Sequence, residues 1–124
     1  MIHDVFGNIT FHVGWKTGKE IELFGRHYEI NLKIQAYFQE DGITLEQENA
    51  YKEFCKDEAD KMHMIENLLR SYAVSPEEQF VPRTLLIQRD GACALLCDDQ
   101  YAPDGGIAVS LYPQMEIVFQ DDYL

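Results

Sequence analysis

The sequence predicts an α+β domain with a mostly antiparallel sheet of about six to seven strands. One long helix or two consecutive central helices are expected to pack on one face of that sheet. Two observations carry the prediction: apolar and polar residues alternate in the first and last thirds of the chain, and apolar residues recur at helical spacing in the middle third. With 124 residues and no long linker, the chain is expected to form a single domain, residues 1–124.

The first third contains three predicted strands. Residues 8–13 alternate between polar and apolar side chains, which is typical of a half-buried strand. The glycines of the stretch 14–18 predict a hairpin turn, and residues 21–23 form the return strand. In the stretch 28–38 every even position is apolar, so one sheet face is packed and the other meets water. A homodimer is one way to cover part of the even-numbered face.

The middle third reads as helix. Asp41 and Gly42 signal a turn, and Thr44 followed by Gln47 fits a capping box at a helix start. Apolar residues then recur at helical spacing over residues 45–72, with charged residues between them. The pattern fits one long helix or two consecutive ones.

The last third returns to strands. Residues 84–88 and 92–97 predict a hairpin around Asp90 and Gly91, and residues 107–111 and 115–119 predict two further strands. The uninterrupted apolar run at 92–97 indicates a central strand that is covered on both faces.

The net charge limits the class of partner that the protein is expected to bind. The chain has 22 Asp and Glu residues against 10 Lys and Arg residues, which gives −12. Such a surface repels nucleic acid and anionic lipid and attracts basic proteins or cations. No nucleic-acid partner and no membrane association are therefore expected. Solubility alone also explains an acidic surface, and the composition leaves both interpretations open.

Cysteine usage and the N-terminal stretch favour a cytoplasmic protein. The three cysteines show no disulfide-framework spacing, and no secretory signal precedes the first strand. Cys93 and Cys97 share one face of a strand but lie about 13 Å apart, too far to bind one zinc ion. Cys55 falls on the apolar face of the predicted helix. Buried structural thiols are the expectation for all three.

No motif for catalysis is present. The serines lack a nucleophile elbow, there is no phosphate-binding loop, and the four scattered histidines show no metalloprotease spacing. His12 and His27 lie on polar strand faces and would be neighbours if their strands paired. We therefore expect a non-enzymatic protein with no cofactor and no catalytic residue.

Acidic residues are expected to gather at one end of the sheet. If the last strands run antiparallel in sequence order, the loop after Cys97 and the end of the final strand meet there, with Arg83 nearby. The carboxylate of Leu124 is expected at the same end. The candidate partner-binding residues are Asp98, Asp99, Tyr101, Asp104, Tyr112, Asp121, Asp122 and Tyr123, with the three tyrosines as exposed anchors.

Two other interpretations of these aspartates remain open. Ca²⁺ and Mg²⁺ prefer carboxylate oxygens, so a small metal-binding domain or a metal-dependent hydrolase is the alternative function. The loop lacks the EF-hand spacing, however. The acids are otherwise simply solvated.

The second half of the chain carries a resemblance. The stretches "VPRTLLIQRDGACALLCDD", "PDGGIAVSLYP" and "IVFQDDYL" resemble a family of small, acidic, uncharacterised bacterial domains that is often associated with toxin-immunity loci. The positions that match its pattern are Gly91, Asp98, Gly106, Gln120, Asp121 and Asp122. The resemblance implies an immunity-type protein that binds and neutralises a basic toxin domain, and it implies no catalytic residue.

Overall fold

A seven-stranded sheet dominates the structure, a computed structural model that describes all residues from Met1 to Leu124. The strands lie in sequence order, β3-β4-β5-β6-β7-β8-β9, and a separate two-stranded sheet, β1-β2, precedes them. The nine strands are β1 (Ile2–His3), β2 (Gly7–Asn8), β3 (Thr10–Phe11), β4 (Trp15–Leu23), β5 (Arg26–Ile34), β6 (Phe80–Ile87), β7 (Cys93–Asp99), β8 (Gly106–Tyr112) and β9 (Glu116–Phe119).

The main sheet is mixed. Strands β5 and β6 run parallel, with Asn31 opposite Thr84 and Ile34 opposite Ile87, while the other neighbouring strands run antiparallel. The expectation of a mostly antiparallel sheet is therefore corrected. The parallel pair arises because a long connection crosses over the sheet between β5 and β6, and this connection holds most of the helical residues.

Two consecutive helices follow one another in this connection. The helical segments are η1 (Gln39–Asp41), α1 (Leu45–Lys56), α2 (Glu58–Tyr72), α3 (Pro76–Gln79) and, after the last strand, α4 (Gln120–Tyr123). The predicted capping box starts α1: Thr44 accepts a hydrogen bond from the Gln47 backbone, and the Gln47 side chain accepts one from the Thr44 backbone. Asp57 separates α1 from α2. No helix has the length and apolar character needed to span a bilayer.

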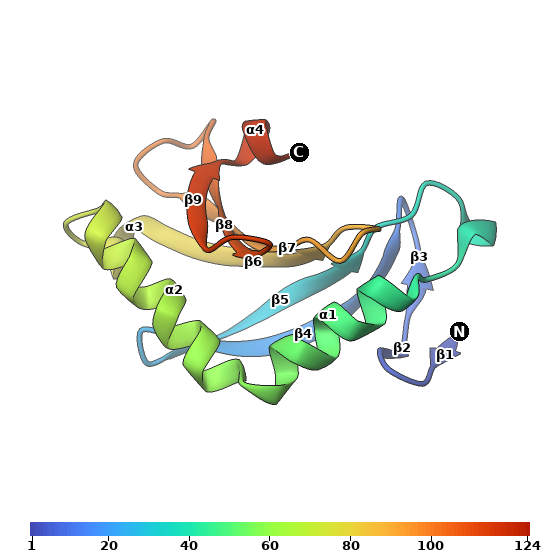
Figure 1. Ribbon diagram of the computed structural model, residues 1–124. Helices are drawn as coiled ribbons and strands as arrows, with labels where there is room; N and C mark the ends of the chain where they lie inside the picture. Colours follow the sequence, from blue (N-terminus) through green and yellow to red (C-terminus); the bar gives the residue numbers. More distant parts are fainter.

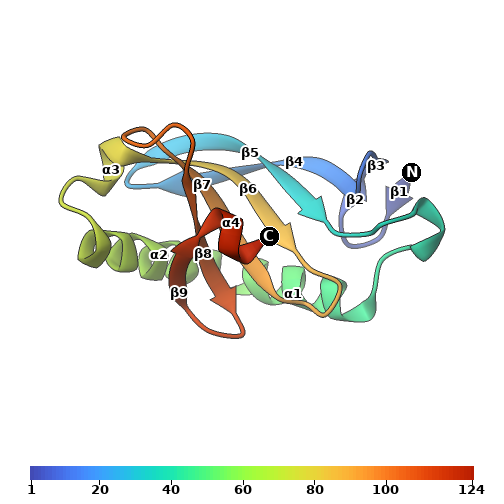
Figure 2. The ribbon, with the colours of Figure 1, turned by 90° about the horizontal axis from the view of Figure 1, so that it is seen from above.

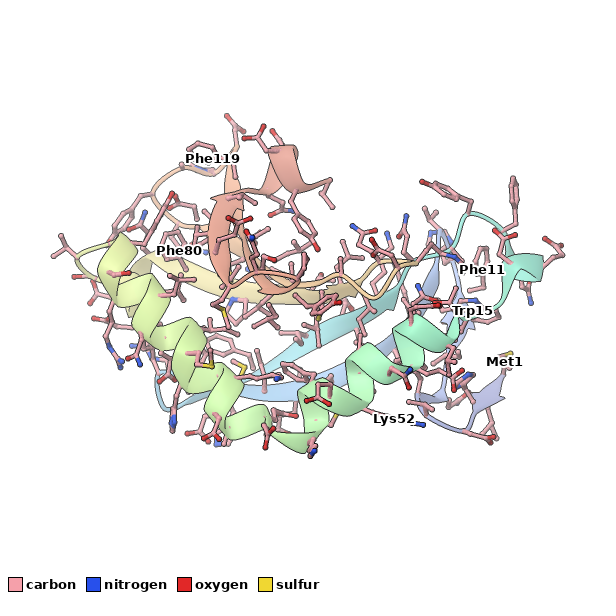
Figure 3. The ribbon with its side chains drawn as sticks, in the orientation of Figure 1. Met1, Phe11, Trp15, Lys52, Phe80 and Phe119 are labelled. Atoms are coloured by element: carbon pink, nitrogen blue, oxygen red, sulfur yellow. The ribbon has the colours of Figure 1, made fainter.

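The main core lies between the sheet and the two helices. Figures 1 and 2 show α1 and α2 on one face of the sheet, and α4 on the other. Phe54 of α1 and Ile65 and Leu69 of α2 belong to the same core cluster as the apolar side chains of β4 to β8. Phe80, fully buried at the start of β6, packs against Tyr72 of α2 with ring centroids 5.9 Å apart (Figure 3).

Strand β4 is longer than predicted. The expected hairpin turn at residues 14–18 is wrong, because Gly18 pairs with Asn31 in the middle of the β4–β5 hairpin. The chain turns instead at Val13 and Gly14, both with positive φ. A second tight turn follows at Phe24 and Gly25, which also have positive φ and match the twist of the two strands.

The period-2 pattern of β5 extends beyond the strand. Strand β5 ends at Ile34, and Ala36 is still buried. Phe38, the last residue of the apolar pattern, is 66% exposed. Its position is explained by the turn into η1, which takes the chain away from the sheet.

Strand β7 is covered on both faces, as the apolar run at 92–97 predicts. Cys93, Leu95 and Cys97 belong to the main core under the helices. Ala94 and Leu96 belong to a second, smaller cluster with Leu86 and Ala108. Val118 and Tyr123 pack against that second cluster, so the C-terminal segment covers the face that the helices leave open.

Candidate functional site

Strand β7 ends in two aspartates, Asp98 and Asp99, just before the loop that leads to β8. Asp99 accepts a hydrogen bond from the Tyr101 backbone at 2.9 Å, and its carboxylate also accepts one from the Gln79 side chain at 3.2 Å. Asp98 forms an ion pair with Arg83, with 2.7 Å between Nε and Oδ2. Arg83 thus neutralises part of this end of the sheet, as its position in the sequence suggests. Asp104 is exposed in the same loop.

The C-terminal helix starts at the same end of the sheet. Phe119 pairs with Ile107 across β9 and β8, and Gly106, the next residue outward, pairs with Asp98. Gln120 lies over Gly106: a Cβ atom there would stand 2.5 Å from its side-chain oxygen and 2.8 Å from the Cys97 carbonyl. Only glycine fits this position.

We call the resulting surface the acidic edge. It consists of Asp98, Asp99, Tyr101, Asp104, Phe119, Asp121 and Asp122. Asp121 and Asp122 are exposed on α4, and Tyr101 and Phe119 are 63% and 65% exposed. Phe119 was not among the predicted anchors, because the alternation of β9 gives no sign that its last side chain is uncovered. Figure 3 shows it on the side of the molecule away from α1 and α2.

Three of the predicted positions lie elsewhere. Tyr112 is 59% exposed but stands at the opposite end of β8, beside Cys93. Tyr123 is half-buried on the second core cluster, and burial raises the pKa of its phenol. Leu124 lines a groove on the open sheet face instead of the acidic edge. The tail folds back over the sheet, which places its last two residues away from the loop.

No group of three or more His, Cys, Asp or Glu side chains is arranged to hold a metal ion. The aspartates of the acidic edge come from separate segments, and Asp98 is engaged by Arg83 while Asp99 accepts hydrogen bonds from Gln79 and Tyr101. The metal-dependent alternative therefore has no donor set in this structure. His12 and His27 also lie apart, at opposite ends of the β4–β5 hairpin, because Trp15 pairs with Ile34 and Glu22 with His27.

The cysteines differ in their surroundings. Cys93 and Cys97 are buried, and burial raises the pKa of each thiol to about 12. Both are protonated at neutral pH and neither is an activated nucleophile. Cys55 is exposed, so its expected place on the apolar helix face is wrong. Its neighbour Phe54 occupies the core instead.

A second acidic region surrounds a hollow of about 380 Å³ on the helix side, which we call the helix-side hollow. Phe54, Cys93 and Leu111 line its apolar part. Its charged and polar lining consists of Glu46, Asn49, Glu53, Lys61, Asp90 and Tyr112. No sequence pattern predicts this hollow, since its residues come from α1, α2, the turn before β7 with the start of β7, and the end of β8.

Comparisons of the chain with protein-family models, with curated proteins and with solved structures found no match.

Proposed function

We propose that this chain is a non-enzymatic interaction protein that binds a basic protein partner, in its most concrete form an immunity-type protein that neutralises a basic toxin domain. One observation carries the proposal. The acidic edge places carboxylates without an ion-pair partner, those of Asp104, Asp121 and Asp122, around the same end of the sheet as two exposed aromatic side chains.

The chemistry of the acidic edge supports this role. Unpaired carboxylates accelerate association with a positively charged partner and select against acidic ones. Aromatic residues such as Tyr101 and Phe119 supply the apolar contact that holds an interface together once it has formed. The net charge of −12 adds a long-range attraction in the same direction.

Strand β9 adds a second means of attachment. It is the last strand in the sheet, so one of its two edges has no neighbouring strand. Unpaired backbone groups on such an edge can pair with a strand of a partner. Phe119 lies at the end of this edge, beside the first residue of α4.

The proposal is tested with the protein encoded immediately upstream, provided that it contains a basic toxin domain. Both proteins are purified, and their affinity and the inhibition of the toxin are measured. The test variant is Asp104→Asn/Asp121→Asn/Asp122→Asn. The matched variant, Glu46→Gln/Glu53→Gln/Asp90→Asn, removes the same three charges from the helix-side hollow.

We expect the acidic-edge variant to bind at least about tenfold more weakly, a change of about 1.4 kcal/mol. The hollow variant is expected to stay within about twofold of the unmodified protein. Equal losses in both would show that only overall charge matters and would remove the acidic edge from the proposal. Absence of binding between the two unmodified proteins would overturn the function itself.

A further inference from the structure

A basic groove lies on the sheet face opposite α1 and α2. Its volume is about 380 Å³, and it crosses strands β4, β5, β6 and β7. The wall on one side is formed by Leu124, after α4, and on the other by Tyr37, in the segment that follows β5. Figure 1 shows the chain rising on both sides of this part of the sheet, and Figure 2 shows α4 close to β6 and β7.

Two lysines stand side by side in the groove. Lys16 of β4 lies directly opposite Lys33 of β5. Their chain neighbours Trp15 and Ile34 are buried in the main core, so the two lysines point to the other face. Like charges at directly opposed positions of a sheet destabilise it. Neither lysine takes part in an ion pair of this protein.

No Asp or Glu side chain lines the groove, and the one acidic group of its lining residues is the terminal carboxylate of Leu124. The whole chain has 22 Asp and Glu residues against 10 Lys and Arg residues, so the charge of the side chains in the groove is opposite in sign to the net charge of the protein. The polar side chains of the groove can all donate a hydrogen bond: Asn31, Gln35, Tyr37, Thr84 and Gln88. Leu86 and Leu96 provide an apolar floor. Two positive charges and side chains that can donate hydrogen bonds, placed around an apolar floor, suit an anionic ligand.

Arg89 fixes one wall of the groove. Its guanidinium donates to the carbonyl oxygens of Gln35 at 3.3 Å, Gly42 at 2.7 Å and Asp41 at 3.2 Å. The segment that carries Gln35 and Tyr37 is thereby tied to the end of β6. A third positive charge stands next to the groove, and the wall is formed before any ligand arrives.

We propose that this groove binds a small organic anion whose phosphate or carboxylate group lies between the ammonium groups of Lys16 and Lys33. Lysine ammonium groups bind such oxygens as point charges, and they do not distinguish the two groups by geometry. The volume falls in the range of pockets that take small molecules. Tyr37, 76% exposed at the rim, offers a flat surface to the organic part of the ligand.

The experiment is a calorimetric titration of the whole chain with four probes: inorganic phosphate, citrate, adenosine 5′-monophosphate and adenosine. We expect the anions to bind and the uncharged adenosine not to bind. Tighter binding of the monophosphate than of inorganic phosphate would show that the organic part is recognised, and tighter binding of citrate would assign the site to carboxylates. Absence of binding by all three anions up to about 10 mM would overturn the proposal, since that is weaker than about 3 kcal/mol.

Charge-matched variants test the place of binding. Lys16→Gln/Lys33→Gln is expected to weaken anion binding at least about tenfold. Lys52→Gln/Lys56→Gln removes the same charge from α1, where both residues are exposed, and is expected to stay within about twofold. Figure 3 shows Lys52 pointing away from the sheet. Equal weakening in both variants would overturn the site.

A second pair of variants keeps the test independent of the lysines. Asn31→Asp places a carboxylate in the groove and is expected to abolish anion binding, whereas Asn49→Asp on α1 is expected to leave it unchanged. Stability gives a further readout. Because the two lysines repel each other, Lys16→Gln/Lys33→Gln is expected to melt at the same or a higher temperature than the unmodified protein. A loss of stability there would assign the lysines a structural role and contradict the proposal.

Discussion

Cys93 and Cys97 show how far burial alone determines the chemistry of a residue. Their side chains are 3% and 0% exposed in the main core. Removal from water disfavours the thiolate, which raises the pKa of each from 9.0 to about 12. The two thiols act as small apolar groups of the core.

These pKa shifts predict a loss of stability in mild alkali. Above pH 9 the thiols ionise in the unfolded chain but stay protonated in the native protein until about pH 12. Their contribution is therefore complete below pH 9 and is lost as the pH rises toward 12. We expect the free energy of unfolding to fall by about 3 kcal/mol between about pH 8 and pH 10, measured by urea titration in the presence of a reductant.

Two variants separate this effect from general alkaline repulsion. Cys93→Ala/Cys97→Ala is expected to lose most of the slope, although it is less stable at every pH because of the cavities. Cys55→Ala, at an exposed thiol, is expected to keep the slope. Three other groups have a raised pKa: Lys19, Tyr51 and Tyr123. Their pKa values in the unfolded chain are 10.0 or above, so they change the free energy of unfolding at higher pH than the thiols do. An unchanged slope in the double variant would contradict the prediction.

At the scale of elements, Gln47 connects α1 to the parallel strand pair. The side chain is fully buried and donates to the carbonyl oxygens of Gln35 at 2.8 Å and Ile87 at 3.3 Å, just where β5 and β6 end. Its oxygen accepts from the Thr44 backbone at 2.9 Å. One side chain thus closes the capping box and holds the helix start against the sheet.

Replacing Gln47 by methionine is expected to lower the free energy of unfolding by about 2 kcal/mol. Methionine has a similar shape, but it leaves the Thr44 N–H without its acceptor and removes two donors to the strand ends. Urea denaturation followed by circular dichroism measures the change. Gln114→Met, at an exposed position between β8 and β9, is the control and should change stability by less than about 0.5 kcal/mol. Equal stability of the two variants would show that the hydrogen bonds contribute nothing net.

The elements themselves follow from local pattern where the pattern is strong. The α1 start at Thr44, the central position of β7 and the apolar face of β5 up to Ala36 agree with the sequence. The first turn does not, since both Gly14 and Gly18 are turn residues by composition. The structure places Val13 at a positive φ, which propensity argues against, and leaves Gly18 inside a strand. Long-range pairing with β5 decides this region.

At the scale of the molecule, the sequence predicts the seven strands of the main sheet but neither the parallel pair within it nor the separate β1-β2 sheet, which divides the predicted strand 8–13 between β2 and β3. Strands β5 and β6 run parallel because a long helical connection joins them. The apolar pattern within one strand does not show in which direction the neighbouring strand runs. The acidic edge was largely predictable, because β7, β8 and β9 do run antiparallel in order. The position of α4 over the open sheet face was not predictable, because the pattern of four residues does not show which surface they pack against.

The charges are divided between the faces and ends of the molecule. Asp and Glu side chains gather at the acidic edge and around the helix-side hollow, whereas none lines the groove with Lys16 and Lys33. On the same open sheet face, Glu20 lies directly opposite Glu29, so two like-charged pairs stand on the β4–β5 hairpin. Only two of the ten Lys and Arg residues form a close ion pair, Lys19 with Glu58 and Arg83 with Asp98, so most of the 22 Asp and Glu carboxylates have no paired cation. Repulsion among the remaining charges therefore opposes folding.

This repulsion predicts that salt stabilises the protein. Raising NaCl from about 0.02 M to about 0.5 M shortens the screening length severalfold and should raise the melting temperature by a few degrees.

A charge-reversal variant tests the same repulsion at one pair. Glu29→Lys, which turns the pair with Glu20 into an attractive one, is expected to raise the melting temperature at low salt and to reduce the response to NaCl. Calorimetric scans in a zwitterionic buffer measure both. Phosphate and sulfate are left out because either could occupy the proposed groove and stabilise the protein by binding. A melting temperature that falls with NaCl would show that ion pairs, not repulsion, dominate its electrostatics.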